Sequence, residues 1–596
     1  MWLNCLIVSF AFPLVMLILP FVINKSKLAK EHKVSHFNLL FAGVFVAAVL
    51  MFYPIHRVTT EAAFSGAVRA VLLSLFTSMQ VFTIGCEFSV VADSAVFCPD
   101  ALDTVYRMWA ALLYVVAPVF TFGFVLSLFK NISAYLKYMG SYFNDVYVFS
   151  ELNERALTLA EDIKSKHKKA VIIFTDVFED NEESSYELLE SAKKIGAICF
   201  KKDMLVINFK RHSARKPISF LAIGNDEAEN LNQSLKLIEN YKSRKETHIY
   251  VFSSKIESEL LLASVDKGEL KVRRINEVQS LVNRILYEQG EVVFDNAKET
   301  DGGDKLISVV VIGMGNHGKE MVKALSWYCQ MDGYKLEINA FDKDPLAEEK
   351  FVALAPELMS AQYNGVDVEG EAQYKITVHP GVDVQSITFA DKLSQITDAT
   401  YAFIALGNDD VNINTAVSVR MYFERMNIHP VIHAVVYNSQ QKNALDGIKN
   451  YRGQPYDIEF VGDMESSYTE DVILDSELEN EALNRHLKWG NEDEFWSYEY
   501  NYRSSMASAI HMKARIKCSI PGAAKKEDEL TSEERRIIEI LEHRRWNAYM
   551  RAEGYVFSGS RDKSSRNDLA KMHHDLVSFS SLVDEEKCKD SKVGSK

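Results

Sequence analysis

Three glycines, Gly313, Gly315 and Gly318, form a Gly-x-Gly-x-x-Gly pattern that can hold a phosphate group. The pattern follows an apolar segment typical of a buried strand and opens a segment with helical spacing. The first glycine allows a tight turn, the second lets a phosphate approach the backbone, and the helix N-terminus supplies a positive dipole. Asp342 ends the next predicted strand, where it can accept hydrogen bonds from ribose hydroxyls. The same glycines would also suit a turn kept only for packing.

We therefore expect a nucleotide, NAD or another adenine nucleotide, as the cofactor of this segment, because the loop has the strand, helix and strand-end acid that such a site requires. A later apolar strand ends at a second polar turn, which we expect to border the same crevice. The expected cofactor-binding residues are Gly313, Met314, Gly315, Asn316, His317, Gly318, Asp342, Lys343, Gly407, Asn408 and Asp409.

A second group of chemically useful residues lies near the C-terminus. His543, Asn547 and Met550 are spaced to share one face of a helix. Arginines nearby offer forked donors to phosphate, and aromatic rings can stack on a base. A small anionic nucleotide is the expected ligand; in the alternative, the aromatic rings form a small core and the arginines are solvated. The expected ligand-binding residues are His543, Arg545, Trp546, Asn547, Tyr555 and His574.

The N-terminal part is apolar enough for a membrane. We expect full spans at 2–23, 37–54 and 108–129, with Lys25 to Lys33 marking an inside loop. The segment 67–85 carries polar residues and is expected to be re-entrant or interfacial. This arrangement predicts a multi-pass plasma-membrane protein with its N-terminus outside and its C-terminal domains in the cytoplasm.

Thr83, Ile84 and Gly85 look like the start of a potassium-channel filter, whose carbonyl oxygens replace water around the ion. The chain then departs from that pattern, because Cys86 and Glu87 follow in place of an aromatic residue and a second glycine. Glu87 could instead form a carboxylate ring that favours cations. A simple membrane anchor with an amphipathic interfacial helix is the alternative.

The soluble part contains an internal repeat of alternating strands and helices. The first copy aligns Ser150, Leu152 and Arg155 with the three glycines, so we expect it to bind no dinucleotide. Both copies carry a Gly-Asn-Asp turn, at 224–227 and 407–410. The expected fold is membrane helices plus α/β, with two doubly wound parallel-sheet (Rossmann-like) domains and a small, mainly helical C-terminal domain.

The glycine loop, the strand-end acid and the two Gly-Asn-Asp turns resemble the RCK family, the regulators of potassium conductance. The resemblance covers roughly 144–290 and 304–490. It implies that four chains assemble their tandem copies into a gating ring that responds to nucleotides or cations. The string from Glu542 to Tyr555, with His574 and Phe579, is similar to the ryanodine-receptor repeat (RyR) domain. That similarity implies sensing of a nucleotide signal, in bacteria within a defence system.

Composition sets further limits. The net charge of −15 argues against a nucleic-acid binder. The seven cysteines include no CxxC pair and no Cys/His cluster, so we expect no metal cofactor. The expected domains are a transmembrane segment at 1–135, the first copy at 144–295, the second copy at 304–500, an RyR-like domain at 528–585 and a disordered tail at 586–596.

The leading functional hypothesis is a nucleotide-gated cation channel, a homotetramer with a pore built from Thr83, Ile84, Gly85 and Glu87. The second is a membrane-anchored nucleotide sensor without a pore. An NAD-dependent oxidoreductase is the third and weakest, because no Ser/His/Asp or Cys/His arrangement accompanies the glycine loop. The expected partners are the lipid bilayer, a small nucleotide and an inorganic cation.

Overall fold

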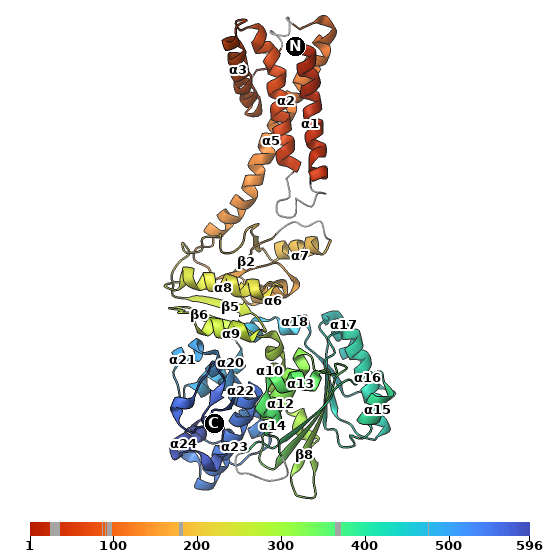
Figure 1. The fold of residues 1–596 in the computed structure, drawn as a ribbon, viewed down its shortest axis with the longest axis vertical. Helices are drawn as coiled ribbons and strands as arrows, with labels where there is room; N and C mark the ends of the chain where they lie inside the picture. Colours follow the sequence, from red (N-terminus) through yellow and green to blue (C-terminus); the bar gives the residue numbers. More distant parts are fainter. Residues whose placement is uncertain are drawn as a thin grey trace. The chain divides into compact units, whose positions relative to one another are not determined.

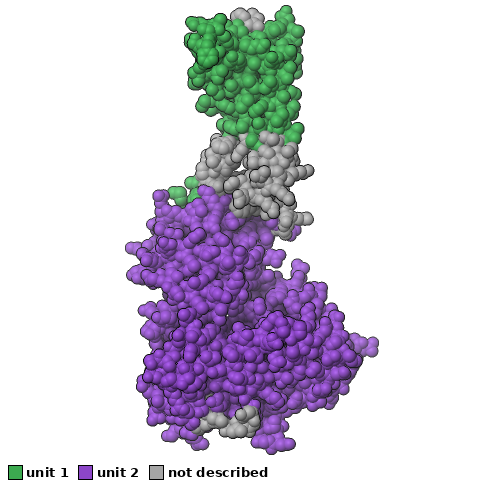
Figure 2. Space-filling model, in the orientation of Figure 1, with its two compact units in different colours: residues 1–139 green, residues 140–596 purple. Residues whose placement is uncertain are grey.

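The computed structural model describes residues 1–23, 36–85, 87–89, 91, 98–177, 183–363, 371–474 and 476–595. The chain forms two compact units, Met1–Met139 (unit 1) and Gly140–Lys596 (unit 2), shown separately coloured in Figure 2. The lysines at 25–33, on which the expected orientation of the first helix depends, lie outside the described residues.

Unit 1 consists mainly of long helices. They are α1 (Trp2–Ile23), α2 (His36–Val58), α3 (Phe64–Phe82) and α5 (Asp100–Met139) (Figure 1). Three stretches are long and apolar enough to cross a membrane: Leu39–Val58, Phe64–Phe82 and Asp100–Phe122. The described apolar part of α1 is shorter and ends at Ile18. Association with a membrane is therefore supported by several helices of this unit.

Helix α3 is the segment that we expected to cross only partly. It is continuous over 19 residues, about 28 Å, which matches a full span. Three of its polar side chains have hydrogen-bond partners, two within α3 and one on α2. Ser74 and Ser78 donate to carbonyls of the preceding turn at 2.6 and 2.7 Å, and Thr77 lies 2.9 Å from His56 Nε2. The hydroxyl groups of α3 thus have partners within unit 1, whereas Arg69 is exposed.

The first copy contains a six-stranded, fully parallel sheet in the order β3-β2-β1-β4-β5-β6. Its central strands β1, β2 and β4 read as short apolar runs, typical of strands covered on both faces. The strands are β1 (Val146–Phe149), β2 (Val171–Phe174), β3 (Ile198–Cys199), β4 (Ile218–Ala222), β5 (Thr247–Phe252) and β6 (Lys271–Ile275). The helices are α6 (Glu154–Lys166), α7 (Glu183–Lys194), α8 (Glu227–Tyr241), α9 (Ile256–Ala263), α10 (Glu277–Gln289) and α11 (Val292–Asp295).

The second copy repeats this order as β10-β9-β8-β11-β12-β15, with β7 added antiparallel to β8. Both copies thus have the strand order typical of dinucleotide-binding sheets, and the expected pair of parallel α/β sheets is confirmed. The strands are β7 (Lys298–Glu299), β8 (Lys305–Ile312), β9 (Tyr334–Phe341), β10 (Tyr374–His379), β11 (Tyr401–Ile404), β12 (Val431–Val435) and β15 (Ile458–Val461), with a separate hairpin of β13 (Asn450–Tyr451) and β14 (Gln454–Pro455). The helices are α12 (Asn316–Tyr328), α13 (Ala347–Leu354), α14 (Pro356–Ser360), α15 (Ile387–Leu393), α16 (Asp409–Arg425) and α17 (Ser439–Asp446).

The structure corrects the alignment of the two copies. Helices α6 and α12 have the same length, and their N-caps are Asn153 and Gly315. Because Asn153 is the fourth residue after β1 whereas Gly315 is the third after β8, the first loop is one residue longer. Ala156, and not Arg155, therefore occupies the position of Gly318. A small buried residue at this position lets each helix pack closely on its strand.

The C-terminal part packs directly on the second copy. Helix α23 contacts α12, with the rings of Trp327 and Tyr549 6.2 Å apart, and both helices contribute to one hydrophobic core. The elements after β15 are α18 (Met464–Ser467), α19 (Glu470–Ile473), α20 (Glu477–His486), α21 (Glu492–Ser497), α22 (Glu499–Lys517), α23 (Ser532–Ala552), β16 (Val556–Phe557), β17 (Met572–His573) and α24 (Asp584–Gly594).

Helix α24 corrects the expectation of a disordered tail at 586–596. Arg515 donates to the carbonyl oxygen of Gly594 at 3.0 Å, and Arg485 donates to that of Val593. The two buried guanidinium groups thus bind the last carbonyls of the helix, where the helix dipole is negative. The polar composition of the tail does not reveal these distant partners.

Candidate functional site

In the glycine loop between β8 and α12, two of the three glycines are explained by packing, because a side chain at either position would collide with the backbone. Gly313 has a φ of +95°, and a Cβ there would lie 2.4 Å from the carbonyl oxygen of Ala405. A Cβ on Gly318 would lie 1.7 Å from the carbonyl oxygen of Gly313. Gly315 differs, because a Cβ there would meet nothing within 4 Å and the residue is exposed. Only the face at Gly315 is therefore open to a ligand.

Asp342 lies beside this loop, as expected from the sequence. Its Oδ2 accepts a hydrogen bond from the Met314 N–H at 2.5 Å, and its Oδ1 accepts one from the Asp344 N–H at 2.7 Å. The neighbouring Lys343 is exposed. The carboxylate thus holds the loop, and a ribose would share oxygens that already bond to the backbone.

The turn after β11 is held by its own polar side chains. Gly407 has a φ of +80°, and the Asn408 side chain caps α16 by accepting from the Val411 N–H at 3.0 Å. Asp409 accepts hydrogen bonds from the N–H groups of Tyr437 and Asn438 at 3.1 and 2.8 Å. The expected binding residues of this turn therefore have structural partners.

A cavity of about 260 Å³ lies at the junction of the two copies. From the second copy it is lined by His317 and Tyr437, whose Nδ1 and hydroxyl lie 3.3 Å apart. From the first copy it is lined by Arg155 and Glu277, which form an ion pair of 3.0 Å. Burial lowers the pKa of His317. Of the expected cofactor-binding residues, His317 is the one that lines this cavity; its neighbour Asn316 is exposed and is not part of the lining.

A larger cavity of about 710 Å³ lies in the C-terminal part. Its lining comes from α20, α22, α23, α24 and the segment around β17, and we call it the C-terminal cavity. Four of the six ligand-binding residues expected from the sequence line it: His543, Arg545, Trp546 and His574. The other two, Asn547 and Tyr555, are absent from the lining.

Asn547 and Tyr555 have structural roles instead. The Asn547 amide donates to the carbonyl oxygen of Val577 at 2.9 Å and lies 3.0 Å from His543 Nε2. Tyr555 is buried, and its ring lies 6.0 Å from that of Tyr500. These two predicted residues therefore lie outside the lining and pack within the protein, whereas ligand binding by the other four stays a prediction.

The lining of the C-terminal cavity is strongly cationic. Seven lysines and arginines face four carboxylates, an excess of three positive charges in a chain whose net charge is −15. Burial, with Arg515 and Arg545 nearby, lowers the pKa of Arg485 to about 10, and burial together with Arg485 lowers that of Lys488 to about 8. The cations of the lining are Arg485, Lys488, Arg545, Lys563, Arg566, Lys589 and Lys592.

Arg545 is the most suitable anchor for an anion. Its side chain is 2% exposed, and its Nε and Nη2 donate to Glu542 Oε1 at 3.1 and 2.7 Å. Its Nη1 is buried and has no hydrogen-bond partner within the described part of the chain. Although burial opposes ionisation, Arg545 and Arg515 lower the pKa of Glu542 to about 2. A buried donor without an acceptor is costly, so a ligand oxygen at Nη1 would be favourable.

Aromatic rings line the same cavity. Trp546 lies 4.9 Å from His573 and 6.1 Å from His543 between ring centroids, and Trp489 and Tyr500 complete the aromatic part of the lining. Rings beside guanidinium groups are the combination that binds a base and its phosphate. A nucleotide-sized anion therefore fits both the chemistry and the volume of the cavity.

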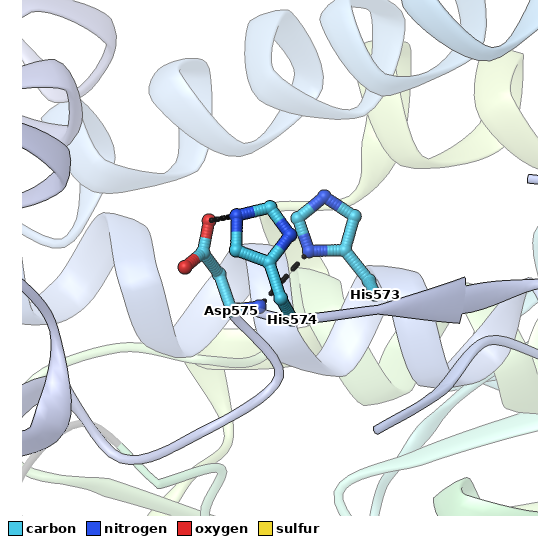
Figure 3. Close-up of side chains that lie close together, drawn as sticks. All are labelled: His573, His574 and Asp575. Atoms are coloured by element: carbon cyan, nitrogen blue, oxygen red, sulfur yellow. Dashed lines mark hydrogen bonds and ion pairs between the residues drawn. The ribbon is translucent and has the colours of Figure 1, made fainter. Parts of the chain in front are cut away.

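His573, His574 and Asp575 project together at the cavity wall (Figure 3). Each offers an atom within 4.8 Å of the others, which is compatible with a metal ion. However, His573 Nδ1 accepts the Asp575 N–H at 3.1 Å, so in the neutral ring the proton lies on Nε2 and neither nitrogen is free. Burial, Arg566 and His574 lower the pKa of His573 to about 3. The trio as arranged suits a polar ligand better than a metal.

Several cavity residues were missed by sequence reasoning. Arg485 lies in the last turn of α20, Lys488 and Trp489 follow that helix, and Tyr500 lies in the first turn of α22. They precede the RyR-like string by about forty to sixty positions and have no spacing relation to it. The signal in the sequence was the density of aromatic and basic residues at the end of the expected second copy, 304–500.

The expected pore residues end a helix. The Gly85 N–H donates to the carbonyl oxygen of Gln80 at 2.7 Å, and the Ile84 N–H donates to that of Val81 at 3.3 Å. With Ile84 at a φ of +60°, this is a Schellman-type helix terminus. Thr83 and Glu87 are exposed, and Cys86 lies outside the described residues. In a single chain these residues therefore form a turn and not an extended filter.

No protein-family model matches the chain, and a search of curated proteins found no similar sequence. The resemblances to RCK and RyR domains therefore depend on the residues quoted above.

Proposed function

We propose that the chain is a membrane-bound receptor for a small anionic ligand of the nucleotide type, held in the C-terminal cavity. The observation that carries this proposal is the buried Arg545, whose Nη1 has no partner among the described residues and which lines a cavity with an excess of three positive charges. An oxyanion would supply the missing acceptor and offset the buried charge.

The ligand class follows from two features of the cavity. Arginines bind phosphate oxygens in a forked geometry, and Trp546 offers a face for a base. The volume of about 710 Å³ lies within the range of about 300–1,000 Å³ typical of small-molecule sites. The glycine crevice of the second copy is a separate candidate for NAD or another adenine nucleotide, supported by the open face at Gly315.

Binding at the cavity is tested on the full chain in detergent, by thermal stabilisation with a panel of linear, cyclic and dinucleotide phosphates. Lys488→Gln removes a cation from the lining, and we expect affinity to fall at least about tenfold, the value of one charged hydrogen bond. Arg545→Gln should have a larger effect. Arg536→Gln is the matched control. Arg536 lies on α23, as Arg545 does, but it is exposed and is not part of the cavity lining. Equal affinity in the Lys488 and Arg536 variants would refute the assignment.

A ligand-gated cation channel is the second candidate for the output of this receptor. It is favoured by α5, one continuous helix from Asp100 to Met139 that carries an apolar stretch and leads in sequence into unit 2. Four chains would surround a plasma-membrane pore near Glu87, with the N-terminus outside and unit 2 in the cytoplasm. A ligand can open such a pore only by binding the open state more tightly.

Measuring cation flux from liposomes distinguishes a ligand-gated channel from a sensor without a pore. Ligand-dependent flux that Glu87→Gln alters would support the channel. Absence of flux with every ligand that stabilises the protein would leave a sensor without a pore, acting through a partner.

A further inference from the structure

The starting ends of the strands in the first sheet lie side by side. Val146 in β1 pairs with Val171 in β2 and with Ile218 in β4. The residues just before these strands are also joined, because the Val171 N–H donates to the carbonyl oxygen of Asp145 at 2.9 Å. Segments that are distant in sequence therefore meet at one edge of the sheet.

This edge is basic. Three lysines precede β2 and four cations precede β4. Lys216 pairs with Asp145 at 3.1 Å, and Lys166 pairs with Asp471 at 2.7 Å. The other members carry no carboxylate partner in the described ranges. We define the basic edge as Lys166, Lys168, Lys169, Lys210, Arg211, Arg215 and Lys216.

Aromatic residues and a hollow accompany the basic edge. Phe143 is 73% exposed and packs edge-on against Tyr142 with ring centroids 4.9 Å apart. A hollow of about 580 Å³ is lined by Phe143, Lys168, Lys169 and Lys216, among others. Exposed aromatic rings beside lysines are typical of protein surfaces at the membrane interface.

The chain connection permits this edge to reach a bilayer. The first charged residue after the apolar stretch of α5 is Lys130, and α5 ends at Met139. The part of α5 from Lys130 to Met139 is about 15 Å long. The connector at 140–145, which leads to Val146, spans at most about 25 Å. Because screening limits surface attraction to about 8 Å, only direct approach to the headgroups would let these cations act.

We propose that the basic edge binds the headgroups of anionic phospholipids in the bilayer that holds unit 1. This inference depends on the membrane-bound part of the proposed function and not on the nucleotide ligand. Charge complementarity identifies the partner, since this patch is cationic in a chain whose net charge is −15 and zwitterionic headgroups offer no net attraction. The binding would fix the first copy at the membrane surface.

The test uses the full chain in nanodiscs of phosphatidylcholine, with or without phosphatidylglycerol, and measures hydrogen exchange at 164–172 and 208–218. We expect slower exchange at both segments when phosphatidylglycerol is present. Lys168→Gln with Lys169→Gln should weaken the association about fivefold for each lysine. High salt should abolish the difference between the two lipids for the unmodified chain.

The matched control is Lys236→Gln with Lys255→Gln, which removes the same charge from α8 and from beyond the far end of β5. Both control lysines are exposed. Protection by phosphatidylglycerol that survives in the control but not in the test pair would support the proposal. Equal exchange in the two lipids, or equal loss in both pairs, would overturn it. Nucleotide stabilisation, measured on the same samples, reports separately on the C-terminal cavity.

Discussion

The two copies start their first helices from the same place on equivalent sheets, but their crevices differ. In the second copy the loop at Gly315 is bare. In the first copy, Glu151 accepts the Asn225 N–H at 3.1 Å, and Arg155 donates to Asn225 Oδ1 at 3.0 Å and pairs with Glu277. Side chains of the first copy thus occupy the region that a phosphate would need, and a carboxylate there repels it.

The two copies share a buried asparagine that hydrogen-bonds to the ends of two neighbouring strands, and we call this arrangement the lock. Asn230 accepts the Gly224 N–H at 2.8 Å and donates to the carbonyl at the end of β5 at 3.0 Å. Asn412 accepts the Leu406 N–H at 2.7 Å and donates to the carbonyl at the end of β12 at 2.7 Å. Each asparagine joins two neighbouring strands through the turn between them. The shared turn motif therefore reports the fold, whereas the glycine loop reports the capacity for a ligand.

Among the changes that test this comparison, Gly318→Ala should cause the largest loss of stability. The new Cβ would lie 1.7 Å from the carbonyl oxygen of Gly313, a backbone atom that cannot move without displacing the loop. We expect the second copy to lose about 3 kcal/mol of unfolding free energy, the upper end of the usual cost of overpacking. Urea unfolding followed by hydrogen exchange in α12 and β8 measures the loss for this copy.

The control for that prediction is Ala156→Gly, the reverse change at the equivalent position of the first copy. It should cost only about 1 kcal/mol, the penalty of glycine in a helix. If Gly318→Ala were as stable as the unmodified chain, the equivalence of the two positions would be wrong.

The parallel sheets were predictable because apolar strands alternate with helices and end in recognisable turns, and the Asp342 position follows from the same pattern. The one-residue difference between the two loops was not predictable. Counted along the sequence from the strand, Arg155 matches Gly318, and the shift becomes visible only from the positions of the helix N-caps. Only the part of the C-terminal cavity that comes from the RyR-like string was predictable. Trp546 belongs to a recognisable string, but Arg485 contributes from another helix through packing that spacing does not encode.

Asn230→Ala and Asn412→Ala should have similar, intermediate effects. The first change removes three side-chain hydrogen bonds and the second removes two. Each also leaves a backbone N–H without its acceptor, so we expect a loss of about 2 kcal/mol in each copy. Asn240→Ala, at the exposed end of α8, is the control and should change stability by less than about 0.5 kcal/mol. A loss confined to one copy, measured by hydrogen exchange in β5 and β12, would show that the lock is not shared.

Gly315→Ala should have the smallest effect on stability and the most informative effect on binding. The residue has a φ of −69°, which alanine adopts without strain, and no atom lies within 4 Å of the new Cβ. As an N-cap change it should cost less than about 1 kcal/mol. A phosphate seated on the loop would collide with the added methyl group, so thermal stabilisation by NAD or ATP should fall. Asn153→Ala, the equivalent cap change in the first copy, should leave that stabilisation unaltered. Stabilisation that persists in Gly315→Ala would mean that the glycines serve packing alone, and that the two crevices are equally closed to nucleotides.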